Sequence, residues 1–367
     1  MKAGWEIKRL GEVCTLQRGF DLPTQNRISG EFPLVSSSGI IDTHNEGPIK
    51  GPGVVTGRSG SIGNVFYIED DFWPLNTVLY VKDFHGNSPR FIYHLLNNFD
   101  LKRFASGAGV PTLNRNFVHD ELVACPPLPE QQRIVAILDE SFEGIAIAKA
   151  NAEQNLQNAR ALFESHLDSI FTQQRDGWIE TSLGNICELV GGSQPPKAVF
   201  SKVKTADYIR LIQIRDYKSD NHVVYIPRSQ ARRFCNAEDV MIGRYGPPLF
   251  QILRGLDGAY NVALMKAVPD ESKLTRDFLF YFLKHSSILQ YVIYHSGRAA
   301  GQIGVTKETL EPYPINLPSL AEQQIVVETI LELESQTQRL ASIYQQKLAA
   351  LDALKKSLLD QAFKGEL

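Results

Sequence analysis

The sequence predicts an α+β fold in which two tandem mixed α/β globular domains are separated by two long helices. Three observations predict it. An internal repeat covers nearly the whole chain, the front part of each copy contains short strand-like runs among Gly and Pro, and the rear part has apolar residues every three or four positions. The helices should pair as an antiparallel coiled coil, and the two copies should close into a pseudo-two-fold, circular arrangement.

Composition limits the class of protein. The chain has 367 residues, is 43% hydrophobic and 22% charged, and has a net charge of −3, which excludes a uniformly basic binder. We expect a soluble, cytoplasmic protein with no membrane partner, because no apolar run could span a bilayer and the N-terminus lacks the apolar core of a signal peptide. The four cysteines form no CxxC pair, so neither a metal site nor a disulfide framework is expected.

The repeat has two fixed tags. Residues 5–14 follow the pattern Trp-x4-Leu-Gly-x2-Cys, which reappears at 178–187, displaced by 173 positions. The Leu-Pro-Glu-Gln-Gln of 128–132 matches the Leu-Ala-Glu-Gln-Gln of 320–324, displaced by 192. The second copy therefore holds about 19 more residues between its tags. Two copies with so long a period indicate a duplicated module and not a repeat array.

Each copy has a globular front part and a helical rear part. The predicted boundaries are 1–125 and 176–317 for the globular domains, and 126–175 and 318–367 for the long helices. Runs such as 53–56 and 77–81 are typical of strands, whereas 91–101 and 277–294 have the apolar content of short helices. Trp5 and Trp178 should anchor each domain in the core.

The long helices carry one apolar stripe each. Apolar residues recur in steps of three and four from Ile134 to Phe171 and from Val326 to Phe363, and the cheapest way to bury both stripes is against each other. At ~1.5 Å per residue, each rod should be about 60 Å long. The second helix ends where the first domain would begin if the chain were closed. The predicted stripes include Leu162, Leu340, Ile343 and Leu354.

The helix starts also carry signals. Pro129 suits a first helical turn, and Ser319 with Glu322 fits a capping box. The Glu-Gln-Gln that both starts share could be capping and solvated surface, packing at the junction between helix and domain, or a partner contact. The acidic outer face of the helices is either solvated or a partner site.

Charge differs between segments. The segment 178–317 holds 17 basic and 13 acidic residues, whereas 126–177 holds 4 and 8. The basic balance of the second domain is compatible with phosphate contact.

The two tags and the intervening variable region resemble the specificity subunit of type I restriction–modification systems. Pro-Leu-Pro-Glu-Gln-Gln-x-Ile-Val at 127–135 opens a long helix as in that family. The resemblance implies that the two domains are target-recognition domains, each of which recognises one half of a bipartite, asymmetric sequence in double-stranded DNA. It also implies that the helices set the spacing and dock two methyltransferase (modification) subunits, which restriction subunits with translocase activity then join.

Loops shared by both copies are candidates for DNA contact. A glycine-flanked arginine on a tight turn lets the backbone approach a phosphate while the guanidinium reaches a groove, although a plain turn with a solvated arginine would look the same. Two loops fit: Gly57-Arg58-Ser59-Gly60 and Gly243-Arg244-Tyr245-Gly246. The shared loops 106–115 and 298–307, with Asn114, Arg115 and Arg298, could contact DNA backbone or pack domain against helix.

Further candidates for base contact lie in the variable regions. They are Ser36 and Ser37 in the first domain and Arg210, Gln213 and Arg215 in the second. Because side chains two apart on a strand share a face, the strand-like run 208–214 should present Gln213 and Arg215 together. A strand with a solvated polar edge is an equal alternative.

The sequence contains no motif for base methylation, nucleotide binding, hydrolysis or metal binding. We therefore expect a subunit without catalytic residues, cofactor or metal. Two alternatives remain open. One is a duplicated coiled-coil scaffold with protein-binding globular ends, and the other is an enzyme with unrecognised catalytic residues.

Overall fold

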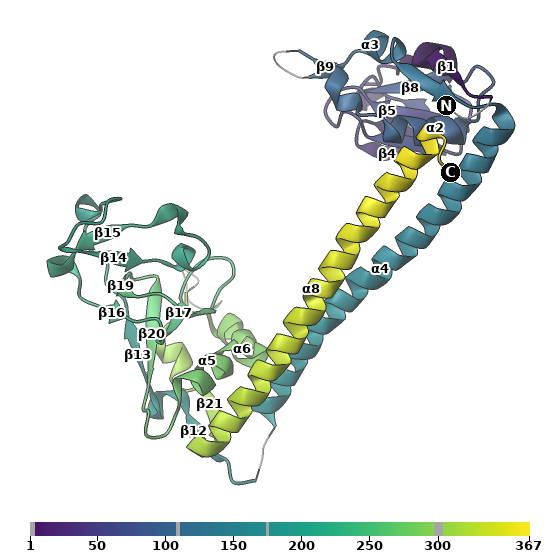
Figure 1. The fold of residues 1–367 in the computed structure, drawn as a ribbon. Coiled ribbons are helices and arrows are strands. Elements are labelled where there is room, and N and C mark those ends of the chain that lie inside the picture. The colour runs from purple at the N-terminus through teal and green to yellow at the C-terminus, as the bar shows by residue number, and fades with distance from the viewer. Residues whose placement is uncertain (1–3, 108–110, 174–175, 297–303) are drawn as a thin grey trace. The chain divides into compact units, whose positions relative to one another are not determined.

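A computed structural model describes residues 4–107, 111–173, 176–296 and 304–367 (Figure 1). By its internal contacts the chain divides into two compact units. The first unit comprises residues 1–153 and 345–367, and the second comprises 154–344. Each unit therefore consists of one globular head and one half of each long helix. We call residues 4–125 the first head and residues 176–317 the second head.

The first head is built on two small sheets. An antiparallel sheet has the order β2 (Thr15–Arg18), β8 (Val78–Asp83), β5 (Gly53–Gly57) and β6 (Val65–Ile68). A second sheet has the order β4 (Gly39–His44), β3 (Phe32–Ser36) and β7 (Trp73–Pro74), with β3 and β7 parallel. The remaining elements connect these sheets to the helices: β1 (Glu6–Arg9), paired with β11 (Leu122–Cys125), α1 (Leu10–Val13), α2 (Pro89–Asn98), β9 (Ala105–Ser106), β10 (Thr112–Leu113) and α3 (Arg115–His119).

The second head repeats this topology. Its antiparallel sheet has the order β13 (Cys187–Gly191), β20 (Leu264–Pro269), β17 (Val240–Gly243) and β18 (Gln251–Leu253). Its other sheet has the order β15 (Tyr225–Pro227), β14 (Tyr208–Ile212), β19 (Gly258–Tyr260) and β16 (Phe234–Cys235), and again one pair, β14 with β19, is parallel. The rest comprises β12 (Ile179–Ser182), paired with β21 (Pro314–Leu317), α5 (Arg276–Lys284), α6 (Ser286–Ser296) and α7 (Lys307–Leu310). Apart from the additional strand β16, the strand order is the same in both heads, which confirms a duplicated module.

The short helices α2 and α5 begin at side-chain caps. Ser88 accepts a hydrogen bond from the N–H of Phe91, and Thr275 accepts one from the N–H of Phe278. Such caps satisfy an N–H group that has no partner inside the helix. The apolar face of each helix then packs into the core of its head, with Phe91 and Phe278 fully buried.

The two long helices are α4 (Leu128–Thr172) and α8 (Leu320–Lys364), with 45 residues each. In the first unit, Arg133 donates a hydrogen bond to the main-chain oxygen of Leu367 at 2.6 Å, and Lys149 forms an ion pair with Asp352 at 2.7 Å. As residue numbers rise along α4 they fall along α8, so the helices are antiparallel, as predicted (Figure 1). In the second unit, the end of α4 and the start of α8 enter one core, which includes Leu167, Ile170, Phe171, Val326 and Ile330.

Part of the predicted apolar stripe is not buried. Four residues that we expected between the helices are largely exposed, at 61% for Leu162, 40% for Leu340, 51% for Ile343 and 47% for Leu354. Two paired helices cover only one narrow strip of each other, so apolar residues at the margins of a wider stripe remain uncovered. The prediction was therefore wrong for these four positions.

A buried glutamine joins each head to its long helix. Gln131 accepts a hydrogen bond from the N–H of Ser88 at 2.9 Å and donates to the carbonyl of Pro126 at 2.9 Å. Gln323 accepts from the N–H of Thr275 at 2.8 Å and donates to the carbonyl of Pro318 at 3.0 Å. Of the three functions that we considered for the shared Glu-Gln-Gln, the structure shows packing at the junction for its middle residue.

The two tag tryptophans lie where the sequence places them. Trp5 is buried in the core of the first head, and Trp178 packs edge to face on Phe278 in the second. Within the residues that the structure describes, no helix is long and apolar enough to cross a bilayer.

Candidate nucleic-acid interface

The two shared loops lie against each other in each head. In the first head, the carbonyl of Arg58 accepts a hydrogen bond from the N–H of Leu113 at 2.8 Å. In the second, the carbonyl of Arg244 accepts one from the N–H of Val305 at 3.0 Å. The tight turn after β5 or β17 and the segment before α3 or α7 therefore form one surface in each head.

Glycines make these turns possible. A Cβ atom at Gly57 would lie 2.0 Å from the carbonyl oxygen of Ser61, so only glycine fits there. Gly60 has φ +81° and Gly246 has φ +93°, a region that other residues rarely adopt. The backbone reason for the glycine-flanked pattern is thus present in both heads.

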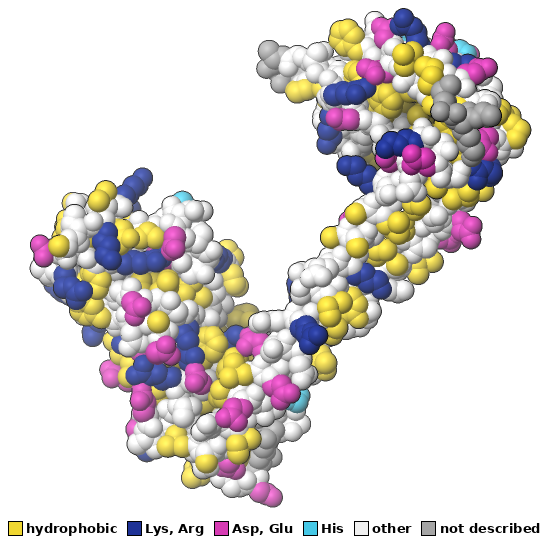
Figure 2. All heavy atoms as spheres, viewed as in Figure 1, with side chains coloured by type: hydrophobic (Ala, Val, Ile, Leu, Met, Phe, Trp, Pro, Cys, Tyr) yellow, Lys and Arg dark blue, Asp and Glu magenta, His cyan; other side chains and the backbone are white. Residues whose placement is uncertain are grey.

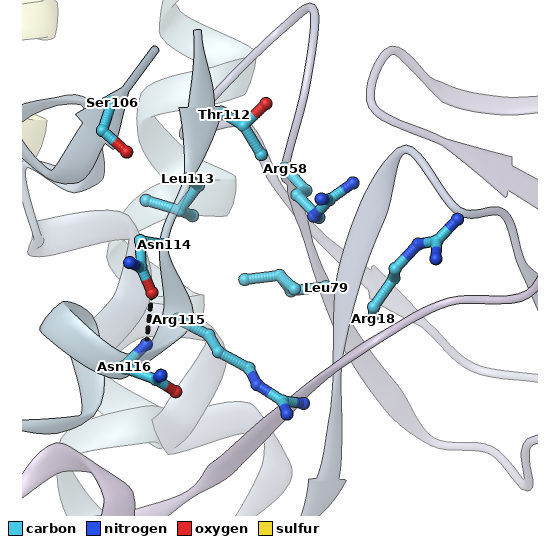
Figure 3. A pocket seen from close by; sticks show the side chains of 9 residues that line it. All are labelled: Arg18, Arg58, Leu79, Ser106, Thr112, Leu113, Asn114, Arg115 and Asn116. Carbon is cyan, nitrogen blue, oxygen red and sulfur yellow. Dashed lines mark hydrogen bonds between the residues drawn. The ribbon is translucent and has the colours of Figure 1, made fainter.

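In the first head this surface contains an open cleft with three arginines. The cleft has a volume of about 420 Å³, and its lining includes Arg18, Arg58, Asn114 and Arg115 (Figure 3). The three guanidinium groups come from β2, from the turn after β5 and from α3, and Leu79 lies among them (Figure 3). We call this the first-head cleft. It brings three of the predicted residues together and adds Arg18.

Most of the positive charge in the first-head cleft is not neutralised. Arg58 Nη1 donates to the carbonyl of Asn76 at 3.3 Å, and Arg115 Nη1 donates to that of Leu16 at 3.5 Å. Neither forms an ion pair with a carboxylate of the described residues. A concave surface with uncompensated guanidinium groups attracts anions such as phosphate.

Asn114 is the N-cap residue of α3, beside the cleft. Its Oδ1 accepts a hydrogen bond from the N–H of Asn116 at 3.1 Å, which caps α3 (the dashed line in Figure 3). Its amide NH₂ group, which makes no hydrogen bond of this cap, can donate to a ligand.

The second head has a basic cleft on a different part of the fold. This second-head cleft has a volume of about 560 Å³, and its lining includes Lys202, Arg210, Arg215, Asp220 and Tyr225. Basic side chains are also prominent over the sheets of the second head in Figure 2. Arg210 and Arg215 are thus brought together as predicted residues, whereas Gln213 is not part of this lining.

Gln213 and Arg215 do not share a strand face. β14 ends at Ile212, Gln213 is the N-cap of a 3₁₀ helix, and Arg215 lies in that helix, Ile214–Tyr217. The turn is fixed by Asp216, whose carboxylate accepts a hydrogen bond from the N–H of Gln213 at 2.9 Å. The expected arrangement was wrong because this local bond ends the strand before Gln213.

The variable candidates of the two heads occupy corresponding places. Val35 is the last residue of β3 that pairs with the parallel strand β7, and Ile212 is the last residue of β14 that pairs with the parallel strand β19. Ser36 and Gln213 are the next residues along the chain. In the first head the chain turns back at once, with the buried Ser36 bonded through its hydroxyl to Ser38 at 2.8 Å. In the second head a longer connection with two 3₁₀ turns replaces this turn and forms one wall of the second-head cleft.

The other predicted residues have the following places. Ser37 is half-buried, and its N–H donates to Thr77 Oγ1 at 3.3 Å beside the glycine-flanked turn. Ser59 is bridged to Thr112. Gly243 is buried at the end of β17, and the ring of Tyr245 covers Gly304 so closely that a Cβ atom there would clash. Arg298 lies outside the described residues.

Arg244 is more constrained than Arg58. Its Nε donates to the carbonyl of Val305 at 2.9 Å, and its Nη1 donates to that of Val262 at 3.3 Å. The first bond holds the segment before α7 and the second holds the turn between β19 and β20, so Arg244 stabilises the free protein.

The sequence did not predict Arg18 or Lys202 as site residues. Neither lies in a motif that the two copies share, and each becomes recognisable only when folding places it beside the predicted arginines. A basic residue at the end of the short strand β2 was the only signal for Arg18.

The structure gives little support for chemistry at the cysteines or for a metal. Burial raises the pKa of Cys187 and Cys235 to about 12, so both thiols are protonated at neutral pH and poor nucleophiles. Among the described residues, no group of three His, Cys, Asp or Glu side chains could hold a metal ion.

Comparison with known proteins gives consistent matches. The family model described as type I restriction modification DNA specificity domain matches residues 2–158 and 175–348. A Mycoplasma pneumoniae protein named as a type I specificity subunit is 25% identical over 88% of this chain and 87% of its own length. The EcoBI specificity subunit of Escherichia coli is 24% identical over 76% of this chain and 65% of its own length.

Solved structures share the fold. One chain, from a study of complex assembly and conformational transition of the type I R-M system, has a TM-score of 0.80 at 23% identity and covers 100% of this chain and 99% of its own. The HsdS subunit from Thermoanaerobacter tengcongensis has a TM-score of 0.63 at 23% identity, with 100% and 98% covered.

Proposed function

Since this chain belongs to the type I restriction modification DNA specificity family, we propose that its heads are two target-recognition domains, 1–125 and 176–317. Each recognises one half of a bipartite, asymmetric sequence in double-stranded DNA. The observation that carries this proposal is that two heads of one topology present differently built basic clefts. Different clefts favour different half-sites, so the combined target need not be palindromic.

The candidate contacts divide into two groups. Arg18, Arg58 and Arg115 contact the first half-site, and Arg210 and Arg215 contact the second. These arginines bind chiefly to DNA phosphates, and from those positions their side chains also reach base edges. Ser37, Ser59 and Gly60, in or beside the glycine-flanked turn, are further candidates for contact with the first half-site. Arg244 and Tyr245 remain candidates for contact with the second half-site. Arg298 remains a candidate for DNA contact on the basis of the sequence alone.

The long helices act as spacer and as docking surface. Two recognition domains joined by stiff helices accept half-sites only at a fixed spacing and phase. Apolar side chains left exposed on the helices suit the packing of partner helices, and these include Ile147, Leu162, Ile325, Leu331, Leu340, Ile343 and Leu354. The partners in this proposal are two methyltransferase subunits, followed by restriction subunits.

We also propose that this subunit is not catalytic and works in the cytoplasm, where it selects DNA for the chemistry of its partners. The family match supports the recognition function, and the buried, protonated cysteines are consistent with it. The scaffold alternative is not favoured by the family match.

The test is to co-express the full chain with a type I methyltransferase subunit that forms a complex with it, and to sequence the modified bases in host DNA. We expect one bipartite, asymmetric motif with an unspecified spacer of fixed length. The double variant Arg58→Ala/Arg115→Ala should relax or abolish one half of the motif, and Arg210→Ala/Arg215→Ala the other half. A palindromic motif, or loss of both halves from variants in one head, would contradict the assignment.

A further inference from the structure

One arginine of each cleft is bound by an exposed aspartate of the same head. In the first head, Arg18 Nη2 lies 3.0 and 3.1 Å from the two carboxylate oxygens of Asp21. In the second head, Arg210 Nη2 lies 2.8 Å from Asp220 Oδ1. The aspartate side chains are 64% and 78% exposed. The two pairs come from different parts of the fold, so the similarity is not inherited from the repeat.

We propose that Asp21 and Asp220 are intramolecular substitutes for a DNA phosphate. In the free protein each carboxylate holds the guanidinium of its cleft, and on DNA binding a phosphate oxygen takes its place. This inference rests on the proposed DNA recognition by the two heads. It identifies the aspartates as positioning residues that DNA must displace.

The geometry of the second-head cleft supports the exchange. Carboxylate and phosphate present similar oxygen pairs to a guanidinium, so a group positioned by one is positioned for the other. Arg210 extends from β14 and its side chain is only 19% exposed, whereas Asp220 lies in a short 3₁₀ turn, Asp220–His222, at the surface. The arginine is therefore the fixed partner and the aspartate the exchangeable one.

Unused hydrogen-bonding capacity also points to a ligand. Arg210 Nε is buried and has no hydrogen-bond partner among the described residues, so the guanidinium is only partly satisfied by Asp220. Lys202 and Arg215 line the same cleft and form no ion pair with a described carboxylate. When Asp220 leaves, three cations face the cleft, which is the charge needed to hold a phosphate.

The exchange has a measurable consequence. A carboxylate that stays in the cleft would repel the phosphate, so DNA binding must break the ion pair and release the aspartate to solvent. Removing the charge of the aspartate removes this competition. The affinity of the Asn variant for any duplex should therefore be higher than that of the wild type. Its affinity should also depend more steeply on salt, because the carboxylate that the wild type releases on DNA binding takes up a cation, and the variant has no such carboxylate.

The test uses the full chain and a random-sequence DNA duplex, with binding followed by fluorescence anisotropy over a series of salt concentrations. Asp220→Asn is compared with Asp207→Asn, which removes an exposed carboxylate just before the same strand without an ion-pair partner among the described residues. We expect Asp220→Asn to bind several-fold more tightly, up to about fivefold, since exposed ion pairs are worth no more than that. Asp207→Asn should change the affinity less. Asp21→Asn and Asp70→Asn form the matched pair for the first head.

A second arm isolates the pair. In an Arg210→Ala background, Asp220→Asn should have no more effect than Asp207→Asn, because no guanidinium remains to be released. If Asp220→Asn matches Asp207→Asn in both backgrounds while the wild-type chain binds the duplex, the inference is overturned and the proposed function stands. If the wild-type chain does not bind the duplex even at low salt, the proposed DNA recognition fails and the inference fails with it.

Discussion

Gln323 accepts a hydrogen bond through its side-chain oxygen from the main-chain N–H of Thr275, at 2.8 Å. Thr275 is the N-cap of α5, so this bond fixes the start of a head helix to the start of α8. Gln131 makes the corresponding bond to Ser88, the N-cap of α2, in the first unit. Because both glutamine side chains are completely buried, no water can replace these bonds.

Replacing Gln323 by Leu should therefore destabilise the second unit. The variant removes the partner of the N–H of Thr275 and of the carbonyls of Lys273 and Pro318. Because the Pro318 carbonyl is buried and the Thr275 N–H is partly buried, the loss should cost about 2–4 kcal/mol in total. Urea denaturation of the full chain measures the loss. Gln324→Leu is the control, since Gln324 is exposed, and it should change the free energy of unfolding by no more than about 0.5 kcal/mol. Equal losses of unfolding free energy in the two variants would show that Gln323 does not stabilise the contact between α5 and α8.

The duplicated tags predicted the fold well because they mark packing positions. Trp5, Leu10 and Leu183 are buried where each head begins, and the shared Glu-Gln-Gln marks the joint between head and helix. Such positions repeat because the same contact must form twice. Helical periodicity likewise predicted α4 and α8, whose long apolar stripes have only one element of matching length to pack on.

Two features could not be predicted from sequence. The apolar period of α8 does not say how wide a strip one neighbour covers, so Leu340 and Ile343 were placed inside although they are exposed. The candidate clefts depend on residues distant in the chain, and Arg18 meets Arg58 and Arg115 only through pairing of β2 with β8. A single bond from Asp216 also decides that Gln213 leaves the strand.

The second unit should lose stability in mild acid because of His285. This side chain is 2% exposed, its ring stacks on Phe171, and burial lowers its pKa to about 4. Unfolding returns the pKa to about 6.5, so the unfolded chain binds more protons between these values and stability falls as the pH falls. The loss from this group should be about 2 kcal/mol between pH 7 and pH 5.

The measurement compares the free energy of unfolding of wild type and His285→Phe at both pH values. The other titratable groups are common to the two proteins, so their contributions cancel in the comparison. The variant should therefore be less acid-sensitive than the wild type by about the same 2 kcal/mol. Parallel pH profiles for the two proteins would mean that the ring is already accommodated in its charged form.

Arg58 and Arg244 should respond differently to truncation despite their shared motif. Arg58→Ala removes a guanidinium with one long bond to a carbonyl, and it should weaken DNA binding by about 1–3 kcal/mol with little change in stability. Arg244→Ala removes two bonds to carbonyls of its own head. It should therefore lower the melting temperature more than Arg58→Ala does, and weaken DNA binding less. Anisotropy titrations and thermal unfolding of the same samples separate the two effects. The contrast fails if both variants lose DNA affinity equally and melt like the wild type.

Lengthening both long helices by the same amount should lengthen the unread spacer of the DNA target. A seven-residue insertion after Glu153 in α4 and another after Tyr344 in α8 fall where the two units meet in sequence. Seven residues make two turns of a coiled coil, so the apolar stripes stay in phase while each helix grows by about 10 Å. At about 3.4 Å per base pair, we expect a spacer about three base pairs longer with both half-sites unchanged.

Sequencing of modified bases in host DNA, with the methyltransferase co-expressed, gives the new motif directly. The control is a four-residue insertion at the same two points, which shifts the apolar stripes out of the seven-residue repeat. It should destabilise the pairing of α4 and α8 and reduce modification overall, instead of giving a clean new motif. If the seven-residue variant modifies the original motif with its original spacer, the helices do not set the distance between half-sites. The spacing would then have to come from the partner subunits.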